Sequence, residues 1–397
     1  MDTGISECFP GMAKRIKVCL ISSYPPNRAR LSEYAKSLTM ELVKSPLIEK
    51  VYIISNISGE EEREFSEADK VNVLRVWMVD NPLSILAVLP IVLRLRPDVV
   101  HFNIHFQSFG KSRIANFTGF LLVFLCTLFR LKTVVTLHNL GETVNLKKVG
   151  LKPSFANRLG IFIATRLVLS ASKIAVTVKL YEMYLKIRYK CGKVIYVPHG
   201  TLANMDPQYV NKSCKPEKII LAFGHMGPHK GLSVLLRAFE EIRREKNDIK
   251  LVIAGADHPN FPGYLKRLKK NVSSDVIFLG YVSDKDVPKV FETADVVVLP
   301  YLTATGTSGV FHLACGYGKP IVVSNLPEIR ELIAEGAAAL LVPTGDHNAL
   351  KEALIRVLED ESMAVEMGRR NLIFAQKEGW DKVVEKYEQI YKELLSR

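Results

Sequence analysis

Short apolar runs without alternating polar residues recur along the whole chain, and stretches long enough for a helix separate most of them. A strand that is apolar at every position has both faces buried, which is typical of a parallel sheet with helices on each side. With 397 residues the chain is longer than one hydrophobic core usually supports. The sequence therefore predicts an α/β protein with two doubly wound, Rossmann-like domains that face a cleft.

The two halves of the chain follow the same plan on either side of residues 198–216, whose Pro, Gly, Asn and Asp are typical of a linker. We expect one domain over residues 1–200 and a second over residues 215–375. A C-terminal helix, at about residues 378–397, has apolar residues at helical spacing and needs a surface to pack on, which the first domain would provide. The expected strands are residues 16–21, 51–54, 71–76, 99–102, 133–137, 174–178, 194–197, 218–223, 251–254, 276–279, 296–299 and 321–323. The expected helices include residues 31–43, 83–95, 156–170, 231–245 and 380–395.

Two glycine-bearing turns in the second half, residues 224–231 and 305–310, each follow an expected strand and precede an expected helix. A turn of this kind leaves backbone N–H groups unpaired at a helix N-terminus, where the helix dipole also favours an anion. The first turn also carries Lys230. Two such turns in one domain favour the binding of a multiply charged phosphate ester.

The six cysteines are scattered without paired spacing, and three of them lie inside apolar runs. This pattern favours reduced thiols in the cytoplasm and argues against a structural zinc site. No apolar signal core precedes the first expected strand, so we expect a cytoplasmic protein.

The positive charge is concentrated in residues 101–200, which carry 15 Lys or Arg and two Asp or Glu, whereas the signs balance elsewhere. The same quarter holds an uncharged run of 16 residues, 114–129, which is shorter than the roughly 20 residues of a spanning helix and indicates a buried or interfacial one. A basic and apolar surface suits an anionic membrane or a lipid phosphate. We expect peripheral binding at the inner face of the membrane and no nucleic-acid partner. The alternative is a solvated basic face beside an ordinary buried helix.

The second half resembles the donor-binding domain of the retaining GT-B glycosyltransferases of family 4, the mannosyl- and glucosyltransferase-like group. The family has Gly-Arg-Leu-x-x-x-Lys-Gly before an apolar helix, and this chain has Gly-His-Met-Gly-Pro-His-Lys-Gly at residues 224–231. The C-terminal helix resembles the segment that crosses back to the first domain in this family. Further matches, in order, are residues 251–255, 276–283, 294–301 and 316–324. The resemblance covers most of residues 218–397 and implies the GT-B fold, with an acceptor-side first domain.

The resemblance implies catalytic roles for Lys230, His138 and His225. Lys230 would hold the leaving diphosphate, because a fixed cation in a dry site stabilises the charge that develops there. His138, at the end of the strand 133–137, matches a family histidine that contacts the donor sugar near the reacting carbon. His225 replaces the family arginine, so its charge depends on pH. The alternatives are a surface lysine at a helix start and a histidine that serves only packing.

The family usually has two glutamates around the second turn, and this chain has Thr305 and Leu313 at those positions. The resemblance assigns these glutamates to the sugar hydroxyls and the ribose. The backbone of residues 306–310 would still bind a diphosphate, with Ser308 as the helix N-cap. The expected donor-binding residues are Gly224, Gly227, Gly255, Tyr281, Val282, Thr305, Gly306, Thr307, Ser308, Gly309 and Val310.

The loop after the first strand has tandem prolines like the family, but its glycines are replaced by Arg28, Ala29 and Arg30. We expect Asn27, Arg28 and Arg30 to lie near the acceptor, where an arginine would bind a phosphate bidentately. A plain exposed turn is the alternative. His101 and His105 lie at and just beyond the end of the expected strand 99–102. The sequence indicates no partner for them, and we expect a structural role.

No Asp-x-Asp motif lies directly at the end of an expected strand and no His/Cys cluster has ligand spacing, so we expect no metal and no cofactor besides a UDP- or GDP-hexose donor. A Gly-x-Gly-x-x-Gly motif is missing after the first strand, which argues against a dinucleotide dehydrogenase. The sequence predicts a retaining, metal-independent glycosyltransferase that moves a hexose from a nucleotide sugar to a lipid-linked or glycan acceptor at the membrane. The alternatives are a GT-B-type nucleotide-sugar epimerase and a non-catalytic subunit that binds sugar nucleotides.

Overall fold

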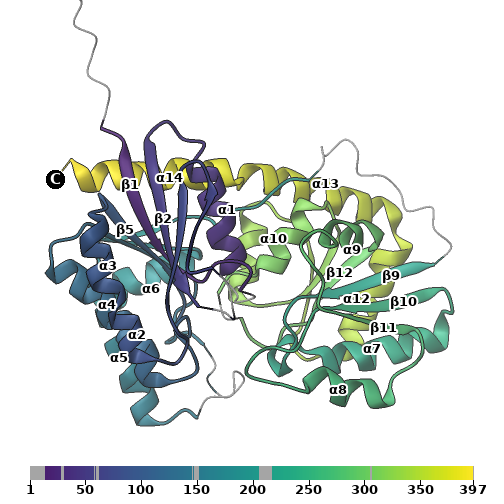
Figure 1. The fold of residues 1–397 in the computed structure, drawn as a ribbon. Coiled ribbons are helices and arrows are strands. Elements are labelled where there is room, and N and C mark those ends of the chain that lie inside the picture. Colours follow the sequence, from purple (N-terminus) through teal and green to yellow (C-terminus); the bar gives the residue numbers. More distant parts are fainter. Residues whose placement is uncertain are drawn as a thin grey trace, which may run out of the picture.

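The strands of the chain form two separate sheets (Figure 1). The computed structural model describes residues 14–27, 31–57, 59, 62–144, 146, 152–204, 217–304 and 306–396. Within these ranges the first sheet has eight strands and the second has six. This arrangement confirms the predicted fold class, an α/β protein with two doubly wound sheets. Most of residues 198–216 lie outside the described ranges, so the domain boundary stays a prediction.

The first sheet has the strand order β3-β4-β2-β1-β5-β6-β7-β8. Its neighbouring strands are parallel, except that β3 runs antiparallel to β4. Helices α1 and α14 cover one face, and α2 to α6 cover the other. The strands are β1 (Ile16–Ile21), β2 (Ile48–Asn56), β3 (Glu64–Ala68), β4 (Val71–Trp77), β5 (Val99–Ile104), β6 (Thr133–Leu137), β7 (Lys173–Val176) and β8 (Val194–Tyr196). The helices are α1 (Ser32–Leu42), α2 (Pro82–Leu86), α3 (Val88–Leu95), α4 (Arg113–Leu128), α5 (Phe155–Val168) and α6 (Lys179–Tyr189).

The second sheet has the order β11-β10-β9-β12-β13-β14, with neighbouring strands parallel. One face packs against α7, α8 and α12, and the other against α9, α10 and α11. The strands are β9 (Lys218–Phe223), β10 (Ile249–Ala254), β11 (Val276–Gly280), β12 (Val296–Leu299), β13 (Ile321–Ser324) and β14 (Leu340–Val342). The helices are η2 (Pro228–Lys230), α7 (Leu232–Glu245), α8 (Tyr264–Leu268), η3 (Lys269–Asn271), α9 (Val287–Thr293), α10 (Gly309–Gly316), α11 (Pro327–Ala334), α12 (His347–Glu359), α13 (Glu361–Lys377) and α14 (Trp380–Leu395).

Helix α14 crosses back to the first domain, as predicted (Figure 1). It follows α13, which packs on the second sheet, and it lies against α1. Its buried stripe shares one core with the β1 and β2 side of the first sheet. The members of this stripe are Trp380, Val383, Val384, Tyr387, Ile390, Tyr391 and Leu394.

One local prediction was wrong, and two strands were missed. The helix expected over residues 83–95 is split into α2 and α3, because Pro90 cannot donate to the carbonyl of Leu86 and its ring crowds that carbonyl. Strand β3 was missed because it is a largely polar strand at the sheet edge. Strand β14, in which only Val342 is buried, was also missed. The helix expected in the uncharged run 114–129 is confirmed as α4, which packs on α2 and α5.

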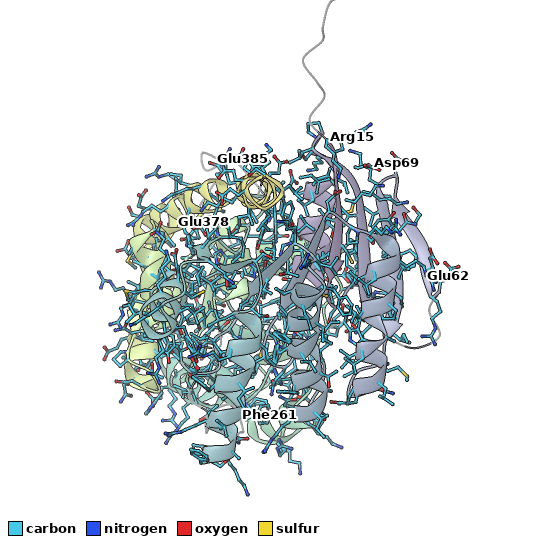
Figure 2. The ribbon with its side chains drawn as sticks, turned by 90° about the vertical axis from the view of Figure 1, so that its left-hand side faces the viewer. Arg15, Glu62, Asp69, Phe261, Glu378 and Glu385 are labelled. Carbon is cyan, nitrogen blue, oxygen red and sulfur yellow. The ribbon has the colours of Figure 1, made fainter. Side chains whose placement is uncertain are left out.

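Each sheet reverses its strand order at a single point, between β1 and β5 in the first and between β9 and β12 in the second. Ligands of open α/β sheets bind beyond the carboxyl ends of the strands at such a point. Figure 2 shows Arg15, before β1, and Phe261, beyond the carboxyl end of β10, at opposite edges of the molecule. Both predicted glycine turns and His138 follow carboxyl strand ends at or next to these points.

Candidate active site

The first glycine turn is closed by backbone contacts rather than open. Gly224 has φ +114°, and a methyl group added at Gly255 would lie 1.9 Å from the Gly224 carbonyl oxygen. The amides of Gly224 and Met226 donate to Ala254 and Ala256, and the amide of Lys230 donates to Gly227. Several amides of this turn are therefore already paired within the protein, because the loops after β9 and β10 pair like an extension of the sheet.

Lys230 lies beside the loop that follows β12. A methyl group at Gly231, which has φ +69°, would lie 1.8 Å from the Pro300 carbonyl oxygen, so the start of α7 presses on that loop. The Lys230 ammonium is 3.8 Å from the centroid of the Tyr301 ring. No carboxylate in the described part of the chain forms an ion pair with it. The site therefore contains a half-buried ammonium that is held by an aromatic face.

The second turn adjoins Lys230 through Tyr301, whose hydroxyl lies 3.0 Å from the Ser308 hydroxyl. Ser308 caps α10 by accepting a hydrogen bond from the Phe311 amide, which confirms the predicted N-cap. The amides of Gly309 and Val310, in the first turn of α10, reach no acceptor among the described residues. This helix start therefore retains the unpaired donors that the sequence predicted for both turns.

The two turns also touch each other and the first domain. A methyl group at Gly224 would lie 3.2 Å from the Val310 side chain, and one at Gly306 would lie 2.1 Å from the His138 carbonyl oxygen. The structure therefore brings Lys230, the second turn and His138 to one place between the sheets.

His138 is 7% exposed and lies at the carboxyl end of β6. Its Nε2 is 2.6 Å from the Asn103 Oδ1, and its ring packs edge-on to Tyr34 at 4.4 Å. Burial, and to a smaller extent the neighbouring histidines, hold the pKa of His138 well below its ordinary value. At neutral pH His138 is therefore an uncharged hydrogen-bonding group.

Other predicted residues lie near this centre or outside the described ranges. Thr305, Arg28 and Arg30 lie outside the residues that the structure describes. The amide of Asn27 donates to the Tyr24 carbonyl oxygen, in the loop after β1. His225 is half-buried on the first turn, and Gly227 lies against the rings of His229 and Phe261. Beyond β11, Tyr281 is exposed, and Val282 packs on the same core face as Val310 and Leu313.

Two histidines outside the predicted site, His199 and His312, connect the second turn to residues 199–201, which follow β8. The His199 and His312 rings stack with centroids 4.9 Å apart. The His312 Nδ1 lies 3.1 Å from the Thr201 hydroxyl, and its Nε2 lies 3.0 Å from the Thr307 hydroxyl. His312 gave no sequence signal because it reads as one position in an apolar helix. His101, which we assigned a structural role, is buried between Tyr391 and Thr136.

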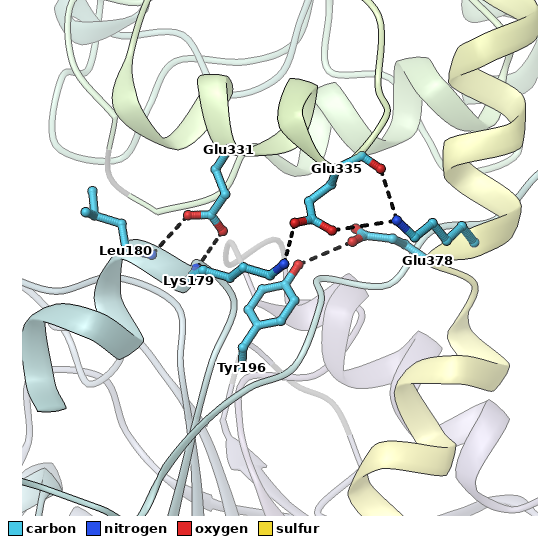
Figure 3. A network of polar contacts seen from close by, with 7 residues as sticks. Lys179, Leu180, Tyr196, Glu331, Glu335 and Glu378 are labelled. Carbon is cyan, nitrogen blue, oxygen red and sulfur yellow. Dashed lines mark hydrogen bonds and ion pairs between the residues drawn. The ribbon is translucent and has the colours of Figure 1, made fainter.

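Helices α6 and α11 join the two domains through polar contacts (Figure 3). The Glu331 carboxylate accepts from the amides of Lys179 and Leu180, 2.5 and 3.0 Å away, at the start of α6. The Lys179 ammonium pairs with Glu335. Near α14, the Tyr196 hydroxyl donates to Glu378 at 3.2 Å. These contacts fix the relative position of the two sheets on one side of the candidate site.

Replacing Glu378 by glutamine tests how this contact region responds to pH. Burial raises the pKa of Glu378 to about 7 from an ordinary value of 4.5. Because the folded pKa is the higher one, stability is fully present below pH 4.5 and is lost as pH rises through 7. We expect Glu378→Gln to gain about 3 kcal/mol in the free energy of unfolding, relative to the native chain, between pH 4.5 and 8. Urea unfolding across this pH range measures the free energy of unfolding of each variant. The control is Glu385→Gln, because Glu385 is exposed. Equal pH profiles for Glu378→Gln and the native chain would contradict the prediction.

No metal site is found in the described part of the chain, where no three His, Cys, Asp or Glu side chains gather as ligands. Among the described helices, none combines the length and the apolar character needed to cross a bilayer.

A known protein family matches part of the second domain. Residues 217–360 match the family model of the glycosyl transferases group 1. A phosphatidyl-myo-inositol mannosyltransferase of Mycolicibacterium smegmatis is 30% identical over 136 residues, which are 34% of this chain and 34% of that protein. The chain spans less than half the length of this mannosyltransferase and of a Methanocaldococcus jannaschii glycosyltransferase that it also matches.

Solved structures share the fold over nearly the whole chain. Sucrose-phosphate synthase from Thermosynechococcus elongatus superposes with a TM-score of 0.77 at 18% identity, covering 96% of this chain and 100% of that one. HepE of Anabaena, solved in complex with UDP-glucose, has a TM-score of 0.68 at 15% identity, covering 96% and 100%. Residues 217–360 thus match the group 1 glycosyl transferases, and nearly the whole chain shares the two-domain fold of these solved structures.

Proposed function

We propose that this protein is a retaining, metal-independent glycosyltransferase that moves a hexose from a nucleotide-sugar donor to a lipid-linked or glycan acceptor. One observation carries the proposal. The Lys230 ammonium, without a carboxylate partner among the described residues, adjoins the start of α10 through Tyr301 and Ser308, and the same turn touches His138. A cation and unpaired amides at one place suit a diphosphate leaving group.

The arrangement suits transfer with retention at the anomeric carbon. The bond between this carbon and the diphosphate oxygen breaks, and the acceptor hydroxyl attacks from the same face, with its proton passing to the departing phosphate. Lys230 and the amides of Gly309 and Val310 stabilise the charge on the diphosphate. His138, uncharged and buried, orients the sugar. These groups take the place that a divalent ion has in other transferases.

A thermal-shift screen with UDP-, GDP- and dTDP-hexoses tests the donor class, because a ligand that binds the folded state raises the melting temperature. We expect one nucleotide sugar to give a clear shift in buffer with EDTA. A shift that appears only with a divalent ion would contradict metal independence. Incubation with that donor alone separates the two rival activities. Formation of the epimer without an acceptor would show that the protein is an epimerase rather than a transferase.

The surface of two contacting helices of the first domain, α4 and α5, favours a membrane acceptor. Helices α4 and α5 contain no Asp or Glu. Their exposed side chains form apolar stripes at helical spacing, and Figure 1 shows both helices on the outer side of the first domain. Lys111, Lys152 and Arg158 are exposed at or near the starts of these helices. The apolar stripes consist of Ile114, Phe117, Phe124 and Leu128 on α4 and of Phe155, Leu159, Phe162 and Ile163 on α5.

An exposed apolar stripe with basic neighbours is typical of helices that lie in the membrane interface. We therefore propose peripheral binding of this face, the apolar face of α4 and α5, to an anionic membrane.

Replacing Phe155 and Leu159 by glutamate is expected to lower binding to anionic vesicles at least about tenfold, because both side chains would leave the apolar phase. Co-sedimentation at low and high salt measures it, and binding should weaken as salt rises. The matched control is Ile373→Glu on α13, since Ile373 and Leu159 are both 45% exposed. Equal losses in the two variants, or no vesicle binding by the native chain at low salt, would contradict membrane docking.

A further inference from the structure

Asn103 connects three strand ends at the point where the first sheet reverses its strand order. It is the penultimate residue of β5 and is 1% exposed. Its side-chain nitrogen lies 2.9 Å from the Ser22 hydroxyl, directly after β1, and 3.5 Å from the Leu31 carbonyl oxygen, directly before α1. Its side-chain oxygen lies 2.6 Å from the Nε2 of His138, directly after β6.

These partners determine which way the Asn103 amide points. The Leu31 carbonyl oxygen can only accept a hydrogen bond, so the NH₂ group must face it. The amide oxygen then faces His138, and this oxygen can also only accept. The hydrogen bond of 2.6 Å therefore requires a proton on the Nε2 of His138.

The surroundings keep His138 neutral, so its second ring nitrogen is unprotonated. The charged or aromatic groups near the ring are His199 beyond β8, His105 after β5, His101 within β5 and Tyr34 on α1. None of these described neighbours is a carboxylate. The Nδ1 of His138 has no hydrogen-bond partner among the described residues. His138 as a whole keeps 7% of its surface exposed.

We propose that Asn103 is a positioning residue that fixes His138 in the Nε2–H tautomer, so that Nδ1 accepts a hydrogen bond from a hydroxyl of the bound sugar. The tautomer follows from the contacts of the free protein, whereas the sugar hydroxyl rests on the proposed function. His138 then selects a donor sugar with a free hydroxyl at one ring position. Neither a hydrogen nor a fluorine at that position can donate to Nδ1.

Nitrogen-15 NMR of the histidine rings in the ligand-free chain tests the tautomer. We expect His138 to show a protonated Nε2 and an unprotonated Nδ1 at pH 7, and Asn103→Ala to show mixed tautomers. Asn103→Asp retains an acceptor and should restore the Nε2–H form, while its carboxylate raises the pKa of His138. The matched control is Asn116→Ala, another buried asparagine of the first domain, which should leave the His138 signals unchanged.

Several outcomes would overturn the tautomer assignment. They are an Nδ1–H form or an imidazolium in the native chain, and an Asn103→Ala spectrum equal to the native one. If Asn103→Ala fails to fold, the rise of the His138 pKa in Asn103→Asp carries the test, and an unchanged pKa overturns the proposal.

The sugar contact is tested by titration calorimetry with UDP-glucose and its monodeoxy and monofluoro analogues, each compared with UDP. We expect the deoxy and fluoro analogues at one ring position to bind about tenfold more weakly than UDP-glucose, the effect of one lost hydrogen bond. Asn103→Ala should reduce this difference. Equal affinities of all analogues, or no gain of UDP-glucose over UDP, would overturn the sugar contact while the NMR result stands separately. Transfer at the native rate by a variant that lacks the Nε2–H form would overturn the role of this tautomer in transfer and leave the proposed function intact.

Discussion

Replacing Lys230 by alanine is expected to lower the rate of hexose transfer about 100- to 1,000-fold, the effect of removing one fixed group that stabilises charge in a transition state. The ammonium is half-buried on the Tyr301 ring and has no carboxylate partner among the described residues. Its charge is therefore available to a ligand, and little folding stability depends on it. We expect the melting temperature of the variant without ligand to stay close to that of the native chain.

Three further variants separate charge from packing at Lys230. Lys230→Met keeps an unbranched apolar stem over Tyr301 and should be as inactive as alanine, whereas Lys230→Arg should retain part of the rate. Lys289→Ala, an exposed lysine on α9 of the same domain, should transfer at the native rate. Initial rates with saturating donor measure all four. A Lys230→Ala variant with the native rate would remove Lys230 from the mechanism and favour the non-catalytic alternative.

Replacing Gly306 by alanine is expected to reduce transfer about 100-fold by forcing the two domains apart at the site. The added methyl group would lie 2.1 Å from the His138 carbonyl oxygen, and backbone cannot rotate away as a side chain can. The second turn and His138 must separate by about an ångström, and a misplacement of this size can reduce a rate about 100-fold. The donor should still bind through the second domain, so we expect a larger loss in kcat than in donor affinity.

Gly336 supplies the matched control for this substitution. Its φ of +116° is nearly that of Gly306, +115°, but an added methyl group meets nothing within 4 Å. Both alanine variants share the strain of a residue in this conformation, of order 1–3 kcal/mol. Only Gly306→Ala has the clash with His138. Equal rates in the two variants would show that the contact between the second turn and His138 has no part in transfer.

Much of the fold follows from local sequence pattern. The strands β1, β6, β9 and β12 and the helix α14 have the bounds that their apolar runs predict, because their stability comes from burial along a continuous stretch. The N-cap at Ser308 was also predictable, since a serine before an apolar run satisfies a local amide. The largely polar edge strand β3 gave no comparable signal.

The candidate site was predictable in its residues but not in its contacts. The sequence indicated Lys230, the second turn and His138, and the structure brings them together. It could not show that the amides of the first turn are used by the loop after β10, because this pairing joins segments about thirty residues apart. Asn103 was missed for the same reason, since its partners Ser22 and His138 are distant in sequence.

The position of a bound diphosphate tests the central claim most directly. We expect a crystal of the chain soaked with the nucleotide sugar that gives the largest thermal shift to show the diphosphate within hydrogen-bond distance of the Lys230 ammonium and of the amides of Gly309 and Val310. Density for the diphosphate elsewhere, or a bound donor that leaves Lys230 and the start of α10 without contact, would contradict the account.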